Sequence, residues 1–274
     1  MSESTRTPFL TPKSNTVFQL LFGDPRNIEL LADFLKAVMN TQDDEYRDIT
    51  IVNPYLTREY PDKKFGIVDL RVTTRSGQII HVEIQRDRFF AMRNRVVFYN
   101  SSLITGQIGE GDEYGGLKRA VSIVITNHEL IAASPLYHHR FTLYDRNAAV
   151  EFTDLFEIRT LELPKLPEKP DVYLWHWLRF FSAETKEELE MVATASPAIR
   201  KATARVLKLS KDERARMLHE AELKAWRDEQ AKLSDAWTEG VIAVARNMLK
   251  RNRPISEIAE DTGLSFNEIK KLTH

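Results

Sequence analysis

Two carboxylates and an amide lie close together in the stretch "GIVDLRVTTRSGQIIHVEIQ", which spans residues 66–85. They belong to Asp69, Glu83 and Gln85. Because successive side chains of a strand point to opposite faces, Glu83 and Gln85 share one face. Carboxylate oxygens are ligands that Mg²⁺ prefers, and a bound metal ion can activate water for attack on a phosphoryl group. The same side chains also fit the solvent-facing side of an ordinary strand, and their spacing alone leaves both interpretations open.

The turn between the two strands decides whether the carboxylates meet. A two-residue loop at 76–77 would pair Asp69 with Ile84 and mix a carboxylate with an apolar face. A three-residue loop at 75–77, with its glycine in the left-handed region, pairs Asp69 with Glu83 instead. The second register keeps the patterns of both strands consistent, so we expect this one.

Carboxylates in such a pair repel each other. Residues directly opposite on antiparallel strands have Cβ atoms about 4.5–5.5 Å apart, so a divalent cation between them is expected. Histidines add no ligand to this site. His81 shares the face of Glu83, but a single histidine is more often an ordinary surface residue. The adjacent His138 and His139 point to opposite faces of a strand and cannot chelate one ion together.

The elements that would position these side chains follow from the periodicity of apolar residues. We expect a helix that begins at Asp24-Pro25 and ends near Asn40, with Asp24 as its N-cap. Three strands, a helix and a further buried strand follow, at residues 49–56, 65–74, 78–86, 89–108 and 117–127. The order α-β-β-β-α-β predicts an α/β fold with a mixed sheet flanked by helices. Strand-like pieces at 139–146 and 158–166 extend this domain to about residue 165.

The rest of the chain reads as helical. Three prolines in "LPKLPEKPD", residues 163–171, favour an extended linker. The aromatic segment 173–181 is too short for a membrane span and is expected to dock on the first domain. We therefore expect a domain at 1–165, a linker and helical region at 166–240, and a helix-turn-helix-like segment at 241–274. That last segment suits a DNA reader and a docking or dimerisation module equally well.

The composition of the chain limits the kinds of partner, chemistry and location that it can have. The 274 residues carry a net charge of −1, so no global field draws the chain onto nucleic acid. The absence of cysteine excludes disulfides, thiolate metal sites and cysteine nucleophiles. The first 13 residues contain no apolar signal region and no segment has the length of a membrane span, which leads us to expect a soluble cytoplasmic protein.

The D…ExQ pattern lies between two recognisable helices, "NIELLADFLKAV" and "RNRVVFYNSSLITGQ". Together they resemble the recombination-promoting nuclease, or transposase-like, branch of the PD-(D/E)XK nucleases. The resemblance covers roughly residues 13–165, together with a C-terminal segment typical of many members. It implies a restriction-endonuclease-like core of the order α-β-β-β-α-β, which is the order that the periodicity indicates independently, with an α-helical C-terminal region.

The resemblance also implies roles for individual residues. Asp69 and Glu83 would bind Mg²⁺, or Mn²⁺ in its place, with the main-chain carbonyl of Ile84 as a further ligand. The lysine of the motif falls on Gln85, which can orient water but cannot accept a proton at neutral pH. Glutamine at this position is usual for the branch. A displaced lysine would be Lys63 or Lys64, near the start of the Asp69 strand. Apart from the resemblance, Arg95 and Tyr99 lie one turn apart on the following helix and could contact phosphate, and their spacing fits packing or an ordinary surface hydrogen bond equally well.

The function expected from this resemblance is Mg²⁺-dependent hydrolysis of DNA phosphodiester bonds by an endonuclease associated with recombination or mobile elements. DNA is then the partner, and two copies of the chain would act together to make a double-strand break. The alternative is a catalytically inactive nucleic-acid-binding or scaffold protein that retains the nuclease fold. Two residues favour it: Gln85, and Asn15, which stands in "KSNTVF" where the branch has an aspartate. A third interpretation is a protein that binds a partner through its helical tail.

Overall fold

The computed structural model of the protein describes residues 9–41, 44–52, 70–88, 90–169 and 172–272. The chain forms two compact units, residues 1–219 and residues 220–274. This grouping differs from the boundaries expected at residues 165 and 240, because the helices that follow residue 172 pack within the first unit. The assignment of functional domains to the three expected segments stays a prediction.

A six-stranded mixed sheet forms the centre of the first unit, and it confirms the expected α/β class. Its strands are β1 (Thr50–Ile51), β2 (Leu70–Thr73), β3 (Ile79–Gln85), β4 (Ala120–Thr126), β5 (His138–Asp145) and β6 (Val150–Glu162), in the order β1-β2-β3-β4-β6-β5. The pairs β1–β2, β2–β3 and β5–β6 are antiparallel, whereas β3–β4 and β4–β6 are parallel. Every residue of β4 is buried, as its unbroken apolar sequence predicts.

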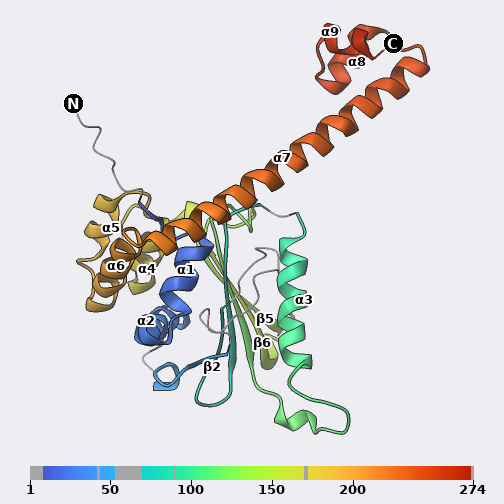
Figure 1. Ribbon diagram of the computed structural model, residues 1–274. Helices are drawn as coiled ribbons and strands as arrows, with labels where there is room; N and C mark the ends of the chain where they lie inside the picture. The colour runs from blue at the N-terminus through green and yellow to red at the C-terminus, as the bar shows by residue number, and fades with distance from the viewer. Residues whose placement is uncertain (1–8, 42–43, 53–69, 89, 170–171, 273–274) are drawn as a thin grey trace, which may run out of the picture. The chain divides into compact units, whose positions relative to one another are not determined.

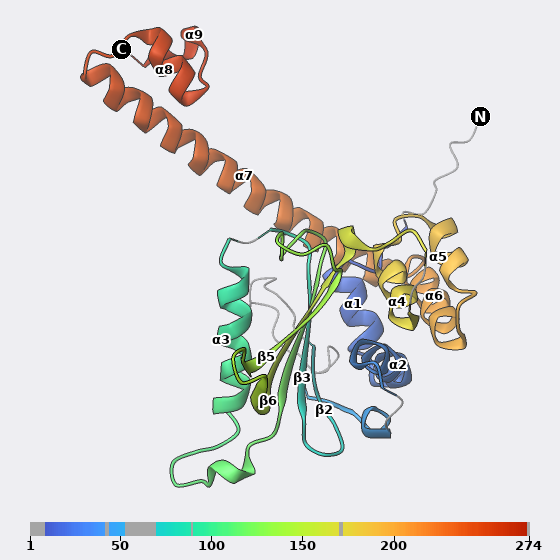
Figure 2. The ribbon, with the colours of Figure 1, turned by 180° about the vertical axis from the view of Figure 1, so that it is seen from behind.

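Helices cover both faces of this sheet. Helix α3 (Met92–Thr105) lies on one face, and α1 (Asn15–Phe22) and α2 (Ile28–Met39) lie on the other, as Figures 1 and 2 show from opposite sides. The expected helix start at Asp24 is a short 3₁₀ turn, Pro25–Asn27, in which the Asp24 carboxylate accepts a hydrogen bond from the backbone N–H of Arg26. Helix α2 follows directly after it.

The main core lies between the sheet and α1, α2 and α4 (Tyr173–Ser182). Phe22, Phe34 and Trp177 form an aromatic cluster there, with ring centroids 5.8 Å apart for Phe22–Trp177 and 5.9 Å for Phe34–Trp177. Trp177 and Phe181 of α4 are fully buried, which confirms that the aromatic segment docks on the first domain. Helices α5 (Lys186–Val192) and α6 (Pro197–Leu209) complete this layer. A smaller cluster of Met92, Val96, Val124 and Ile158 lies under α3.

The start of the proline-rich segment is folded, and the expectation of an extended linker from residue 163 is wrong there. Leu163–Lys165 form a 3₁₀ turn in which Leu163 is buried. The Lys165 ammonium lies 2.7 Å from the buried Glu162 carboxylate and donates to the carbonyl oxygens of Ile131 and Ser134. Sequence spacing cannot reveal these partners, because two of the three lie about 30 residues away along the chain.

The second unit contains the end of α7 (Glu213–Lys250), followed by α8 (Ile255–Thr262) and α9 (Phe266–Lys271). Ala245, Ile258 and Ile269 form its small core. Ser265 and Glu268 make a capping box at the start of α9, as their spacing predicts. Among the described residues, no helix is long and apolar enough to cross a membrane.

Candidate active face on strand β3

The β2–β3 hairpin has the three-residue loop that the sequence predicts. Leu70 pairs with Val82 and Thr73 with Ile79, and the Thr74 N–H donates to the Gln78 carbonyl over 2.9 Å. Gly77 has a φ of 88°, in the left-handed region that glycine tolerates. The register favoured by the alternating pattern is therefore confirmed for the described residues of both strands.

The alternation along β3 separates its side chains into two sets. Ile80, Val82 and Ile84 face the main core. Glu83 faces α3, and by alternation His81 and Gln85 share that face. Glu83 is only 2% exposed and His81 6%. The interpretation of this strand face as an ordinary solvated surface is therefore wrong for Glu83, because the side chain is buried. A buried carboxylate needs a compensating charge.

That charge comes from α3. The Arg95 guanidinium lies 3.2 Å from Glu83 Oε1, and its side chain is 15% exposed. The Arg95 guanidinium carbon also lies 5.4 Å from the centre of the Tyr99 ring, a cation–π arrangement. The structure thus brings together Glu83, Arg95 and Tyr99, three residues that the sequence singled out separately. Contact of Arg95 or Tyr99 with phosphate stays a prediction.

Gln85 lies at the end of β3, where the parallel pair β3–β4 also ends. It is half-buried, it pairs with Thr126, and its carbonyl accepts from the Asn127 N–H over 3.1 Å. The carboxyl ends of parallel strands are the edge at which α/β sheets usually bind ligands. Gln85 and the preceding Ile84 carbonyl are thus part of the described structure close to Glu83, and their roles in catalysis stay predictions.

His128 is a residue that the sequence reasoning missed. It lies in the turn after β4, and its carbonyl accepts from the Thr126 hydroxyl over 2.7 Å. Burial and the nearby cationic Arg88 lower the pKa of His128, which favours the neutral form of its imidazole. No sequence signal identifies it, since only the parallel pairing brings the turn after β4 close to the end of β3.

Asp69 and Lys64 lie outside the described residues, as does Lys63. The described part of the chain contains no cluster of three or more His, Cys, Asp or Glu side chains that could hold a metal ion. Within it, the donors that fit a hard cation at this face are the buried Glu83 carboxylate and the Ile84 carbonyl. Oxygen donors of these two kinds suit Mg²⁺ or Mn²⁺.

The two adjacent histidines behave as expected. His138 Nε2 lies 3.4 Å from Nη1 of Arg159, whereas His139 Nδ1 lies 3.4 Å from the Glu162 carboxylate. They contact different partners and do not converge on one point.

Comparison with known proteins gives one finding. A family model described as PD-(D/E)XK nuclease family transposase matches residues 12–236. Searches of curated proteins and of solved structures give no match.

Proposed function

Because the chain belongs to the PD-(D/E)XK nuclease family transposases, we propose that it is a metal-dependent endonuclease that hydrolyses DNA phosphodiester bonds in recombination or the movement of mobile elements. One observation carries this proposal beyond the family. Glu83, the acidic residue of the ExQ motif, is a buried carboxylate on a sheet face whose register follows the predicted hairpin.

Asp69 is the second carboxylate in this proposal. This rests on the sequence, whose predicted three-residue loop pairs Asp69 with Glu83. The two carboxylates and the Ile84 carbonyl would hold Mg²⁺, with Mn²⁺ as a substitute. When bound, a divalent ion polarises a phosphoryl oxygen and lowers the pKa of a water molecule.

Gln85 has a positioning role. Its amide can donate to and accept from the attacking water, but it cannot take a proton from it. We propose that Gln85 orients this water and that the proton leaves to solvent or to a phosphate oxygen. Lys64 is an auxiliary candidate on the sequence evidence alone.

Arg95 has two states in this proposal. In the absence of a metal ion, it compensates the charge of Glu83, as the 3.2 Å contact shows. When the carboxylate instead holds an ion, the guanidinium is available for a phosphate oxygen of the DNA. Tyr99 keeps it nearby through the ring contact. A phosphate contact suits the planar, permanently charged group of arginine.

Cleavage of plasmid DNA by the purified full chain tests the proposal. We expect nicked or linear product with Mg²⁺ or Mn²⁺ and none with excess EDTA. Two copies of the chain acting on the two strands would give linear product early in the reaction. The absence of cleavage with either ion, at protein concentrations that retain DNA in a gel-shift assay, would count against an enzyme.

A second candidate function follows from two observations. Glu83 already has a cationic partner in Arg95, and Gln85 cannot act as a base. Both suit a DNA-binding or scaffold protein that has kept the fold without the chemistry. Titration calorimetry with Mn²⁺ separates the two candidates, because a scaffold of this kind would show no Glu83-dependent ion binding. DNA as the substrate or ligand is compatible with the cytoplasmic location expected from the sequence.

A further inference from the structure

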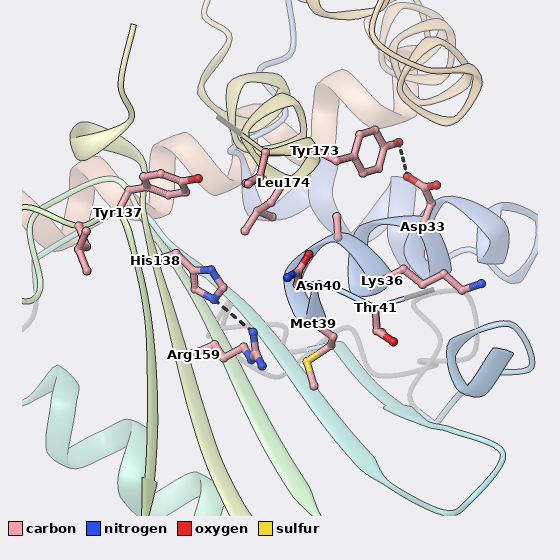
Figure 3. Close-up of a pocket in the computed structure, with 13 residues that line it drawn as sticks. Asp33, Lys36, Met39, Asn40, Thr41, Tyr137, His138, Arg159, Tyr173 and Leu174 are labelled. Atoms are coloured by element: carbon pink, nitrogen blue, oxygen red, sulfur yellow. Dashed lines mark hydrogen bonds between the residues drawn. The ribbon is translucent and has the colours of Figure 1, made fainter. Parts of the chain in front are cut away.

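A pocket of about 590 Å³ lies on the face of the sheet opposite Glu83, within the first unit. Its walls come from three segments far apart in the sequence: the end of α2, strands β5 and β6, and the start of α4 (Figure 3). Polar side chains and apolar ones both line it. They include Arg159, His138, Asn40, Asp33, Leu136 and Leu174.

Arg159 is the buried cation of this pocket, with only 7% of its surface exposed. Its Nε donates to the Glu157 carboxylate over 2.6 Å, and its Nη1 donates to the Val38 carbonyl over 2.6 Å. Within the described part of the chain, no group accepts a hydrogen bond from its Nη2. A nearly buried guanidinium thus retains donor capacity at a pocket wall.

The charge of Arg159 is only partly compensated. Its carboxylate partner, Glu157, is fully buried and is shared with two other arginines: Arg119, in a short contact, and Arg140, at 2.7 Å. Arg140 also lies 3.6 Å from the half-exposed Glu151. Among the described residues, three guanidinium groups therefore face two carboxylates, which leaves one positive charge in excess. A buried cation without full compensation is costly, and a bound anion would offset that cost.

His138 supplies a second donor. Its Nε2 lies 3.4 Å from Nη1 of Arg159, and Figure 3 shows the two side chains in contact at one wall. A guanidinium N–H can only donate, so Nε2 accepts and the single proton of the neutral ring is on Nδ1. Burial, with the charge of Arg159, lowers the pKa of His138 to about 4. The ring is therefore neutral at pH 7 and offers an N–H to a ligand.

The remaining lining sets the size and character of the ligand. Among the described residues that line the pocket, the only carboxylate is that of Asp33, whose Oδ2 accepts from the Tyr173 hydroxyl at 2.6 Å and the Trp177 indole N–H at 2.8 Å. Asn40 is exposed and adopts a left-handed conformation at the end of α2. Leu136, which is 60% exposed, adds apolar surface, and Leu174 lines the pocket from the main core with 3% of its surface exposed. The space is much larger than one inorganic anion, and the apolar wall suits a flat organic group.

We propose that this pocket binds a nucleotide, with its phosphate monoester on Arg159 and His138 and its base against Leu136 and Leu174. The excess positive charge favours a dianionic phosphate over a singly charged carboxylate, and arginine matches phosphate geometry with paired donors. Such a phosphate could come from a free mononucleotide or from the end of a DNA strand. The site is separate from Glu83 and does not depend on the proposed nuclease activity.

Calorimetric titration of the full chain with deoxyadenosine 5′-monophosphate tests the proposal, in EDTA to prevent cleavage. We expect saturable binding at least tenfold tighter than that of deoxyadenosine, which lacks the phosphate. A 5′-phosphorylated oligonucleotide that binds more tightly than its 5′-hydroxyl counterpart would identify the strand end as a source. Binding of the mononucleotide without this difference would identify the free nucleotide. Either result supports the site.

Variants locate the binding. Leu136→Trp places a large ring in the pocket from a residue that is 60% exposed, so the fold tolerates it, and we expect at least a tenfold loss of affinity. Leu143→Trp, at a 45% exposed leucine outside the pocket lining, is the matched control and should leave affinity unchanged. Arg159→Gln should also lose tenfold or more if it folds, and Glu83→Gln should not. Equal binding of nucleotide and nucleoside, no saturable binding, or unchanged affinity in Leu136→Trp would overturn the proposal.

Discussion

Glu83 and Arg95 form a partly buried ion pair that links strand β3 to helix α3. Removing one partner of such a pair weakens the compensation of the other, buried charge, which is more costly than losing a surface salt bridge. The pair therefore contributes to stability in the metal-free protein, and it holds the carboxylate in the position that the proposed chemistry requires.

Arg95→Met removes the charge and keeps most of the volume. We expect the free energy of unfolding to fall by about 3 kcal/mol in the absence of metal ions. Arg93→Met, at an exposed arginine on the same helix, should change it by less than about 0.5 kcal/mol. Urea denaturation in EDTA measures both, and equal stabilities of the two variants would contradict the role given to Arg95.

His138 makes stability depend on pH. Its folded pKa of about 4 lies below the ordinary value of 6.5, so the unfolded chain binds the proton more readily. The contribution of the neutral His138 to the free energy of unfolding is fully present above pH 6.5 and is lost as the pH falls toward 4. Between pH 7.5 and pH 5 this corresponds to about 2 kcal/mol.

His138→Asn should remove most of that pH dependence. Denaturation of both proteins at pH 7.5 and pH 5 tests this, since an asparagine does not titrate. A variant with the same loss of stability on acidification as the wild type would show that other groups cause it.

Among the elements, the β2–β3 hairpin sets the register of the candidate face through Gly77. A residue with a side chain at position 77 would have to adopt an unfavourable left-handed backbone conformation, and its Cβ would lie 3.3 Å from the Lys118 side chain. We expect Gly77→Ala to lower the free energy of unfolding by about 1–2 kcal/mol. Gly115→Ala is the control, because its Cβ would meet open space and its φ is not positive. Thermal unfolding distinguishes them, and equal effects would contradict the strain argument.

The elements could be predicted from the sequence because each depends on local patterns. The alternation in β3 and the glycine of its turn predict the register, and the aromatic segment of α4 predicts its docking. What the sequence could not predict depends on distant partners. Arg95 of α3 forms an ion pair with Glu83 of β3. Lys165, in the segment expected to be a linker, donates to the carbonyls of Ile131 and Ser134. Arg159 of β6 donates to the Val38 carbonyl of α2.

For the whole molecule, the position at which the chain is divided decides whether the sheet remains folded. Trp177 and Phe181 are fully buried in the main core, so the helices after residue 172 belong to the same folding unit as the sheet. We expect residues 1–219 to fold alone. Residues 1–170 should lack a cooperative transition because they expose the surfaces of Phe22 and Phe34.

Circular dichroism and limited proteolysis of the two truncated chains test this division. Cooperative unfolding of residues 1–170 would show instead that the sheet with α1 to α3 is an independent domain, as the sequence alone suggested.

We propose that Glu83 and Asp69 hold the metal ion that DNA cleavage requires. The most direct measurement is single-turnover cleavage of plasmid DNA in Mg²⁺ by the wild type, Glu83→Gln and Asp69→Asn, with DNA binding measured in parallel. Glu187→Gln, at an exposed glutamate on α5, is the control. We expect both site variants to bind DNA and to cleave at least 100-fold more slowly, while the control cleaves at the wild-type rate. Cleavage by Glu83→Gln or Asp69→Asn at the wild-type rate would contradict the claim.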